Sequence, residues 1–94
     1  MDFIFEWDKI KAEHNARKHG VSFDEAQTVF LDCFSVMIPD ESHSNIEERF
    51  LLIGTSHKHR ILVVSYTDRG DIIRVISARK ATGHERRQYE DNDF

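Results

Sequence analysis

The chain has 94 residues, 39% of them hydrophobic, which is enough for one modest core over residues 1–94 and excludes intrinsic disorder. Its one cysteine, Cys33, excludes an intrachain disulfide, and we expect a buried, inert thiol in a reducing, cytoplasmic setting. Met1-Asp2-Phe3 lacks the basic region of a signal peptide, and the apolar runs at 50–53 and 61–64 are too short to cross a membrane.

The formal net charge of −4, taken alone, disfavours a nucleic-acid partner, but the charge is unevenly distributed. Residues 1–50 hold five Lys/Arg and eleven Asp/Glu, whereas residues 57–87 hold eight Lys/Arg and three Asp/Glu. Residues 88–94 add three acids. This asymmetry predicts a basic face on an acidic body, with an ordinary solvated surface as the alternative.

The first half of the chain predicts one strand and two helices. Apolar residues alternate over 2–6, which is typical of a short strand. A helix over 9–19 follows, with Asp8 as its N-cap and Gly20 as its left-handed C-cap. Ser22 and Glu25 have the spacing of a capping box for a second helix over 22–31, whose apolar stripe covers a sheet face.

The second half predicts a meander and one more helix. Strand-forming runs occupy 34–38, 49–55, 60–66 and 72–79; a polar loop follows the first run, and short turns join the last three. Thr82 and Glu85 form the capping box of a short helix. The expected fold is therefore α+β: two N-terminal helices on a four- to five-stranded, mostly antiparallel sheet, with a short C-terminal helix.

Arg79 is the first candidate for chemistry, because it ends the last strand beside a helix N-terminus, a combination that favours an anion such as phosphate. The alternative is an ion pair with Glu48 or Glu6. Strand alternation predicts that Arg74 and Arg79 point to opposite faces.

Two other side chains have both a chemical and a structural interpretation. His19 can serve as a general acid or cap its helix, and Tyr89 can contact a phosphate or base or pack the last helix onto the sheet.

The six histidines do not predict a metal site. His14 and His19 are five residues apart on a helix and are not expected to share a face. His57 and His59 flank a turn without a cysteine or carboxylate partner, and no spacing fits a closed zinc site. We therefore expect no metal and no cofactor.

Several strings of residues, in this order and spacing, resemble the BrnT family of ribonuclease toxins. They are Phe5-Glu6-Trp7-Asp8, Lys18 to Phe23, Glu48-Arg49-Phe50 with Gly54, and Arg74 followed by Ile76 to Thr82, Glu85, Arg86 and Tyr89. The resemblance runs along almost the whole chain. It implies a RelE-like fold and RNA cleavage without a metal, in which the ribose 2′-OH attacks the adjacent phosphate. It also implies that a small BrnA-like antitoxin neutralises the toxin. The antitoxin binds DNA, and the toxin associates with DNA only through the antitoxin.

That chemistry requires cations at the phosphate and a proton donor for the leaving oxygen. The residues implied as catalytic are Arg79, His19, Arg49 and Tyr89, and those implied as RNA-binding are Lys18, Arg60, Arg74, Lys80 and Arg86. The alternative function is a non-enzymatic module that binds a partner and acts as a co-repressor with a DNA-binding subunit.

Overall fold

The computed structural model describes residues 3–43 and 47–91, so residue 2 of the first predicted strand lies outside the described part. The elements in chain order are β1 (Ile4–Glu6), α1 (Lys9–His19), α2 (Phe23–Thr28), the 3₁₀ turn η1 (Val29–Leu31), β2 (Val36–Pro39), the 3₁₀ turn η2 (Glu41–His43), β3 (Phe50–Thr55), β4 (Ile61–Arg69), β5 (Ile72–Lys80) and α3 (Gly83–Glu90). None of these helices has the length and apolar run needed to span a bilayer.

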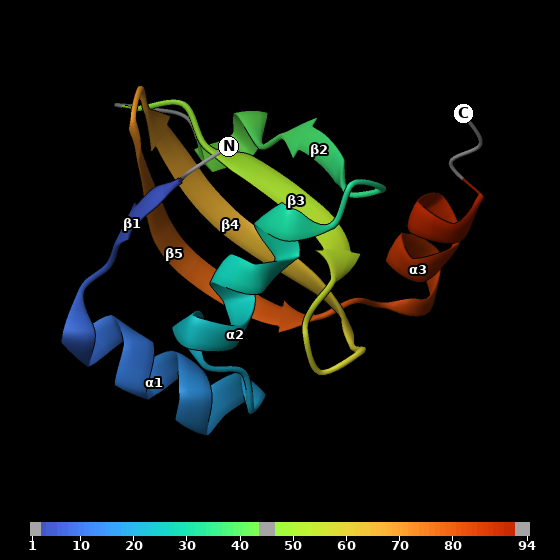
Figure 1. The fold of residues 1–94 in the computed structure, drawn as a ribbon, viewed down its shortest axis with the longest axis horizontal. Coiled ribbons are helices and arrows are strands. Elements are labelled where there is room, and N and C mark those ends of the chain that lie inside the picture. Colours follow the sequence, from blue (N-terminus) through green and yellow to red (C-terminus); the bar gives the residue numbers. More distant parts are fainter. Residues whose placement is uncertain (1–2, 44–46, 92–94) are drawn as a thin grey trace.

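The strands form one sheet in the order β1-β5-β4-β3-β2, in which β1 runs parallel to β5 and every other pair is antiparallel. Figure 1 shows α2 crossing one face of the sheet, α1 beside β5, and α3 beyond the end of β3. The predicted α+β fold is therefore confirmed. β4 is longer than predicted and turns into β5 at Gly70, whose φ of 78° fits the glycine there.

The second helix is shorter than predicted, because α2 ends at Thr28 and the chain tightens into η1. The Thr28 hydroxyl donates to the carbonyl oxygen of Glu25 at 2.7 Å, within the turn where the helix narrows. The hydroxyl of Ser22 caps the Glu25 N–H at 3.0 Å as predicted. The second bond of the predicted capping box, from the Ser22 N–H to the Glu25 side chain, is wrong, because the Glu25 carboxylate accepts from Ser56 and Arg60 instead.

The core lies between α2 and the sheet face that it covers. Its fully or nearly buried members share this layer and are Val21, Phe23, Ala26, Val29, Leu52, Leu62, Val64, Tyr66, Ile73, Val75 and Ala78. Apolar burial of this kind is the main favourable term in folding, so the core holds β4 and β5 as a rigid platform.

β5 contains a β-bulge. Ser77 pairs with Ser65 and Val75 pairs with Tyr66, so one residue of β5, Ile76, has no opposite partner on β4. A bulge of this kind inserts one extra residue and shifts the alternation of side chains by one position.

The bulge changes which side chains of β5 share a face. Val75 and Ala78 both lie in the core under α2, although they are three residues apart. Arg74, Ser77 and Arg79 therefore share the far face of the sheet, away from α2. The prediction that Arg74 and Arg79 point to opposite faces is wrong, because simple alternation takes no account of Ile76.

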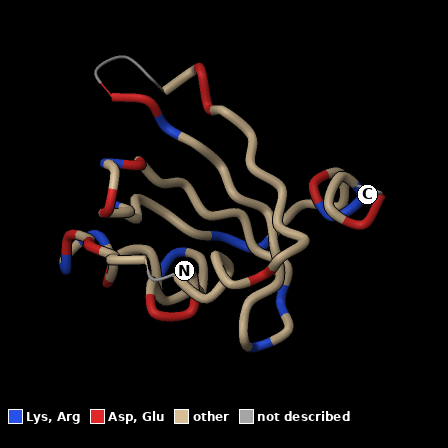
Figure 2. The backbone as a smooth tube through the Cα atoms, turned by 45° about the horizontal axis from the view of Figure 1, so that its top comes forward, with Lys and Arg blue, Asp and Glu red and all other residues tan. Residues whose placement is uncertain are grey.

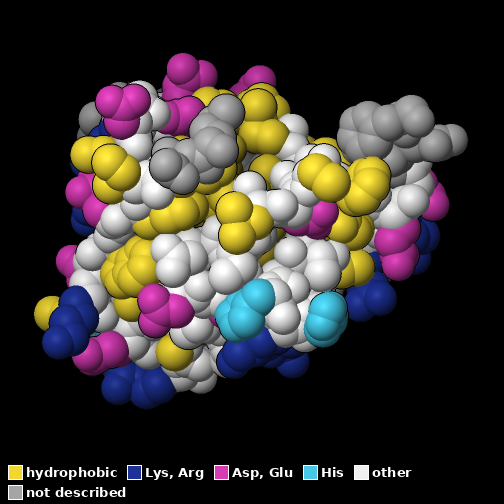
Figure 3. Space-filling model, in the orientation of Figure 1, with side chains coloured by type: hydrophobic (Ala, Val, Ile, Leu, Met, Phe, Trp, Pro, Cys, Tyr) yellow, Lys and Arg dark blue, Asp and Glu magenta, His cyan; other side chains and the backbone are white. Residues whose placement is uncertain are grey.

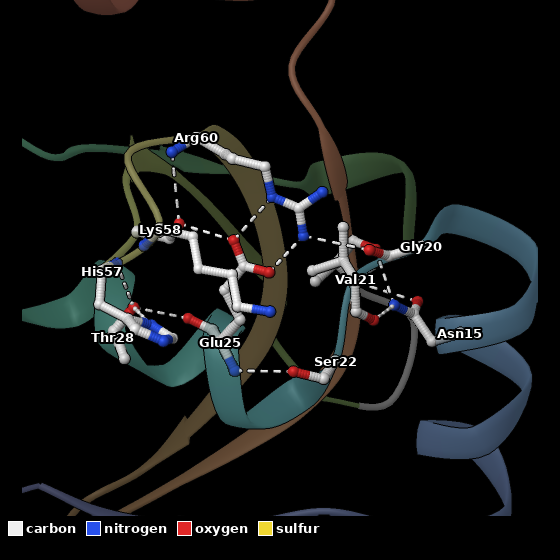
Figure 4. Close-up of polar contacts among 11 residues, drawn as sticks. Asn15, Gly20, Val21, Ser22, Glu25, Thr28, His57, Lys58 and Arg60 are labelled. Carbon is white, nitrogen blue, oxygen red and sulfur yellow. Dashed lines mark hydrogen bonds and ion pairs between the residues drawn. The ribbon is translucent and has the colours of Figure 1, made fainter.

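Asn15 closes the free edge of β5. β1 pairs with only the first three residues of β5, which leaves the backbone of Ala78 facing α1. The buried Asn15 side chain accepts a hydrogen bond from the Ala78 N–H at 3.1 Å and donates to the Ala78 carbonyl oxygen at 2.8 Å. It also donates to the Val21 carbonyl oxygen at 2.9 Å (Figure 4), so one amide fixes α1, the α1–α2 connection and β5.

Asn15→Ala is expected to lower the free energy of unfolding by at least about 2 kcal/mol, because each buried polar group left unpaired costs about 1–3 kcal/mol. Arg17→Ala, an exposed change on the same helix, serves as the control. Denaturant titration of both variants measures the difference. Equal stability of the two would show that Asn15 does not hold the edge.

Candidate functional site

A groove follows the far face of the sheet, with α1 as one wall. It consists of two hollows of about 400 and 260 Å³ that share Lys11 and Ile76. The larger is also lined by His43, Glu47, Arg49, Thr67, Arg69 and Arg74, and the smaller by His14, Asn15, Lys18, His19 and Ser77. We call these residues together the basic groove, because its described lining carries five Lys or Arg and one carboxylate.

The groove draws its cations from distant parts of the chain. Lys11 and Lys18 come from α1, Arg49 precedes β3, and the other arginines come from β4 and β5. Figure 2 shows Lys and Arg positions on α1 and near the ends of the long strands, with Asp and Glu positions close by. The basic face is therefore not made by residues 57–87 alone.

Surface ion pairs hold the arginines at one end of the groove. Arg69 donates to Glu47 at 2.7 Å and to Glu6 at 3.2 Å, and Arg74 lies 3.5 Å from the same Glu6 oxygen. The hydrogen bond from Arg69 lowers the pKa of Glu47. Exposed pairs of this kind contribute only about 0–1 kcal/mol, so an incoming anion can displace them at little cost.

Four of the residues predicted as functional meet in the groove: Lys18, His19, Arg49 and Arg74. His14 and His19 both line the smaller hollow, although five residues separate them on α1. The prediction also missed Lys11, although Lys11, His14 and Lys18 recur at helical spacing, and that stripe was the available signal.

Arg79 lies on the same sheet face, but its guanidinium is engaged. It donates to both carboxylate oxygens of Glu85, at 2.7 and 2.8 Å. Glu85 also completes the predicted capping box with Thr82. Arg79 therefore forms an ion pair, as the alternative interpretation predicted, but with Glu85 rather than with Glu48 or Glu6. The hydrogen bond from Arg79 lowers the pKa of Glu85 to about 2.

Arg79→Ala and Glu85→Gln break the same ion pair, but only Arg79→Ala removes the guanidinium. Comparison of the two variants therefore separates a structural role of Arg79 from a catalytic one. Because both nitrogens of the Arg79 guanidinium that face Glu85 are occupied, we expect both variants to lower the melting temperature alike and to retain, per folded molecule, the RNA cleavage that the family resemblance implies. The contribution of the pair is complete above about pH 4.5, the unfolded pKa of Glu85, and is lost as the pH falls toward 2.

Thermal melts from pH 7 to pH 2 and single-turnover cleavage measure both quantities. Loss of cleavage in Arg79→Ala with full cleavage in Glu85→Gln would instead assign Arg79 to catalysis, as the family resemblance implies.

Tyr89 fastens α3 to the body of the protein. Its hydroxyl donates to Asp32 at 2.5 Å and lies 3.0 Å from the Thr55 hydroxyl. Burial, followed by the bond to Asp32, raises the pKa of Tyr89. These contacts favour the packing interpretation, and a proton-donor role for Tyr89 stays a prediction. Lys80 and Arg86 are exposed, at the end of β5 and on α3.

Arg60 belongs to a second polar cluster, on the α2 side of the sheet (Figure 4). The Glu25 side chain is 1% exposed, accepts from Arg60 Nε at 2.9 Å and from the Ser56 hydroxyl at 2.6 Å, and pairs with a second Arg60 nitrogen. Arg60 also donates to the Gly20 carbonyl oxygen at 3.1 Å. The predicted RNA contact of Arg60 is untested, and its observed partners tie the β3–β4 connection to α2.

Cys33 is exposed, so the expectation of a buried thiol is wrong. It lies in the turn between η1 and β2, where Leu31, Phe34 and Met37 are also exposed. Figure 3 shows hydrophobic side chains over the upper part of this side of the molecule, with Lys, Arg and His along its lower rim.

In the described part of the chain, no three His, Cys, Asp or Glu side chains gather as metal ligands.

The sheet, the flanking helices and the cation-lined groove define a small α+β protein with a surface suited to an anionic polymer. Residues 7–85 match the family described as "Ribonuclease toxin, BrnT, of type II toxin-antitoxin system". The chain belongs to this family, as its sequence motifs indicated, and the family description implies an antitoxin partner.

The fold is similar to the 1.1 Å crystal structure of the Brucella abortus ribonuclease toxin BrnT, with a TM-score of 0.67. The match covers 86% of this chain and 99% of that chain at 24% identity, so this likeness concerns the fold. Comparison with curated proteins gives no match.

Proposed function

We propose that this protein is a metal-independent endoribonuclease toxin that cleaves RNA in the basic groove and so inhibits translation in the cytoplasm. The observation that carries the proposal is the match of residues 7–85 to a ribonuclease toxin family. The groove supports it, because it holds the two groups that the chemistry needs, cations and an imidazole, on one rigid face.

The proposed reaction uses the ribose 2′-OH as the nucleophile. Attack on the adjacent phosphorus forms the 2′,3′-cyclic phosphate, with the 2′-hydroxyl proton passing to solvent water, and breaks the bond to the 5′-oxygen, which takes up a proton as it leaves. Arg49 and Arg74 stabilise the charge that develops on the phosphorane oxygens, Lys18 binds the RNA backbone, and His19 donates the proton.

We further propose that a cognate BrnA-like antitoxin neutralises the toxin by covering the groove and nearby cations from residues 57–87. Acidic groups of the antitoxin would occupy positions that RNA phosphates otherwise take. Binding to DNA then resides in the antitoxin, and the toxin reaches DNA only through it.

The test is incubation of the purified chain with single-stranded RNA in the presence of EDTA. The expected result is cleavage to fragments with 2′,3′-cyclic phosphate ends, and slowed growth of cells that express the chain without its antitoxin. Intact RNA with well-folded protein would contradict the enzyme and favour a co-repressor. Cleavage that EDTA abolishes would contradict metal independence alone.

A further inference from the structure

The hydroxyl of Thr67 is buried without a hydrogen-bond partner. Thr67 is 2% exposed, and its Oγ1 is the one such atom found among the buried side chains of the described residues. A buried hydroxyl without a partner destabilises a fold, and buried polar groups are normally satisfied. Because this hydroxyl lies beneath the groove, it indicates that a ligand bound there supplies the missing hydrogen-bond partner.

The surroundings of Thr67 are those of an anion site. Thr67 pairs with Arg74 across β4 and β5, so both side chains are on the far face of the sheet. It lines the larger hollow together with Lys11, Arg49, Arg69, Arg74 and the carboxylate of Glu47. The lining thus has an excess of cations around one unused hydroxyl.

Access to the hydroxyl requires only side-chain movement. The side chains of Arg69 and Arg74 are 46% and 32% exposed, and they pair with the surface carboxylates of Glu6 and Glu47. Surface pairs of long side chains rearrange at small cost. The β4 backbone at Thr67, by contrast, is fixed by its pairing with Arg74 of β5 and follows Tyr66, which is paired on both sides.

We propose that the larger hollow is a subsite for an RNA backbone phosphate, in which Thr67 Oγ1 donates a hydrogen bond to a non-bridging phosphate oxygen while Lys11 and Arg69 supply charge. This inference rests on the proposed function and adds to it. The two hollows share Lys11 and Ile76, so a phosphate held at Thr67 leaves a neighbouring phosphodiester beside His19. Thr67 is then a positioning residue that sets which bond is cleaved.

The test compares Thr67→Val, which keeps the shape and removes the hydroxyl, with Thr67→Ser, which keeps the hydroxyl. Binding of a 2′-O-methyl RNA oligonucleotide, which cannot be cleaved, is followed by fluorescence anisotropy. Thr67→Val is expected to weaken binding about tenfold or more, as for loss of a hydrogen bond to a charged group. Its melting temperature should equal or exceed that of the wild type, because an unpaired buried hydroxyl is gone.

Thr67→Ser should bind nearly as well as the wild type, as should Ser65→Ala, a control on the same face of β4 that lines neither hollow. Equal affinity of Thr67→Val and wild type would overturn the subsite while the ribonuclease function stands. The subsite would also be overturned if Thr67→Val melted at a lower temperature and lost RNA binding only because part of it was unfolded. It would be overturned as well if Thr67→Val lost affinity for the antitoxin but not for RNA. If the wild-type chain neither binds nor cleaves RNA, the proposed function fails first, and the phosphate subsite with it.

Discussion

Glu25→Ala is expected to destabilise the protein more than any other single change considered, toward the lower end of the range of about 3–5 kcal/mol seen when a buried ion pair loses one partner. The carboxylate accepts from Arg60 and Ser56 at once, so its removal leaves both donors without their acceptor. The lower end applies because the Arg60 side chain is 29% exposed and regains some hydration.

Thermal melts of Glu25→Ala should show this as a loss of roughly 4–8 °C for each kcal/mol in a domain of this size. The hydrogen bond from Arg60 holds the pKa of Glu25 below its ordinary value of 4.5. The difference in melting temperature between Glu25→Ala and wild type is therefore largest above about pH 4.5 and becomes smaller as the pH falls below that value. The double change Glu25→Leu with Arg60→Met, which replaces both charges, should recover much of the loss. A melting temperature for Glu25→Ala equal to that of wild type would contradict a structural role.

His19→Ala is expected to give the largest loss of activity, about 10²–10⁴-fold in the cleavage step, as is typical when a general acid is removed. His19 is half-buried in the last turn of α1 and lines the smaller hollow, so it would lie beside RNA bound in the groove as proposed. The fold should persist, because the αL cap at Gly20 keeps its own backbone hydrogen bond to Ala16.

His14→Ala is the matched control, since His14 lies on the same helix and lines the same hollow but is exposed. It should change RNA binding modestly and leave the cleavage step close to wild type. Single-turnover cleavage at saturating protein separates binding from chemistry. Equal losses in the two variants would reduce His19 to a binding role, and an unaffected His19→Ala would remove it from the mechanism.

Elements whose signals are local could be predicted from the sequence. The caps at Asp8, Gly20 and Thr82 act within a few residues, and each is observed. The meander follows from short turns between apolar runs, which leave few other ways to pair the strands. Local signals of this kind also placed Lys18 and His19 together at the end of a helix.

Features that depend on pairing between distant segments could not be predicted. Asn15 bonds Ala78 across 63 positions of the chain, and nothing near either residue marks the pair. The bulge at Ile76 appears only when β4 and β5 are in register, and it decides the face on which Arg79 lies. The same bulge brings Ser77 onto the face that lines the groove, so the site could be predicted only in part.

The amide of Asn15 has a further consequence for how this sheet can grow. Exposed strand edges invite pairing with another chain, and proteins avoid aggregation by blocking them. One border is occupied by the short β1 and then by a side chain that takes the place of a neighbouring strand. The other border, β2, is four residues long and ends at Pro39, which has no N–H to offer. A chain that extends this sheet by strand addition must therefore do so along β1 or β2, over a very short register in either case.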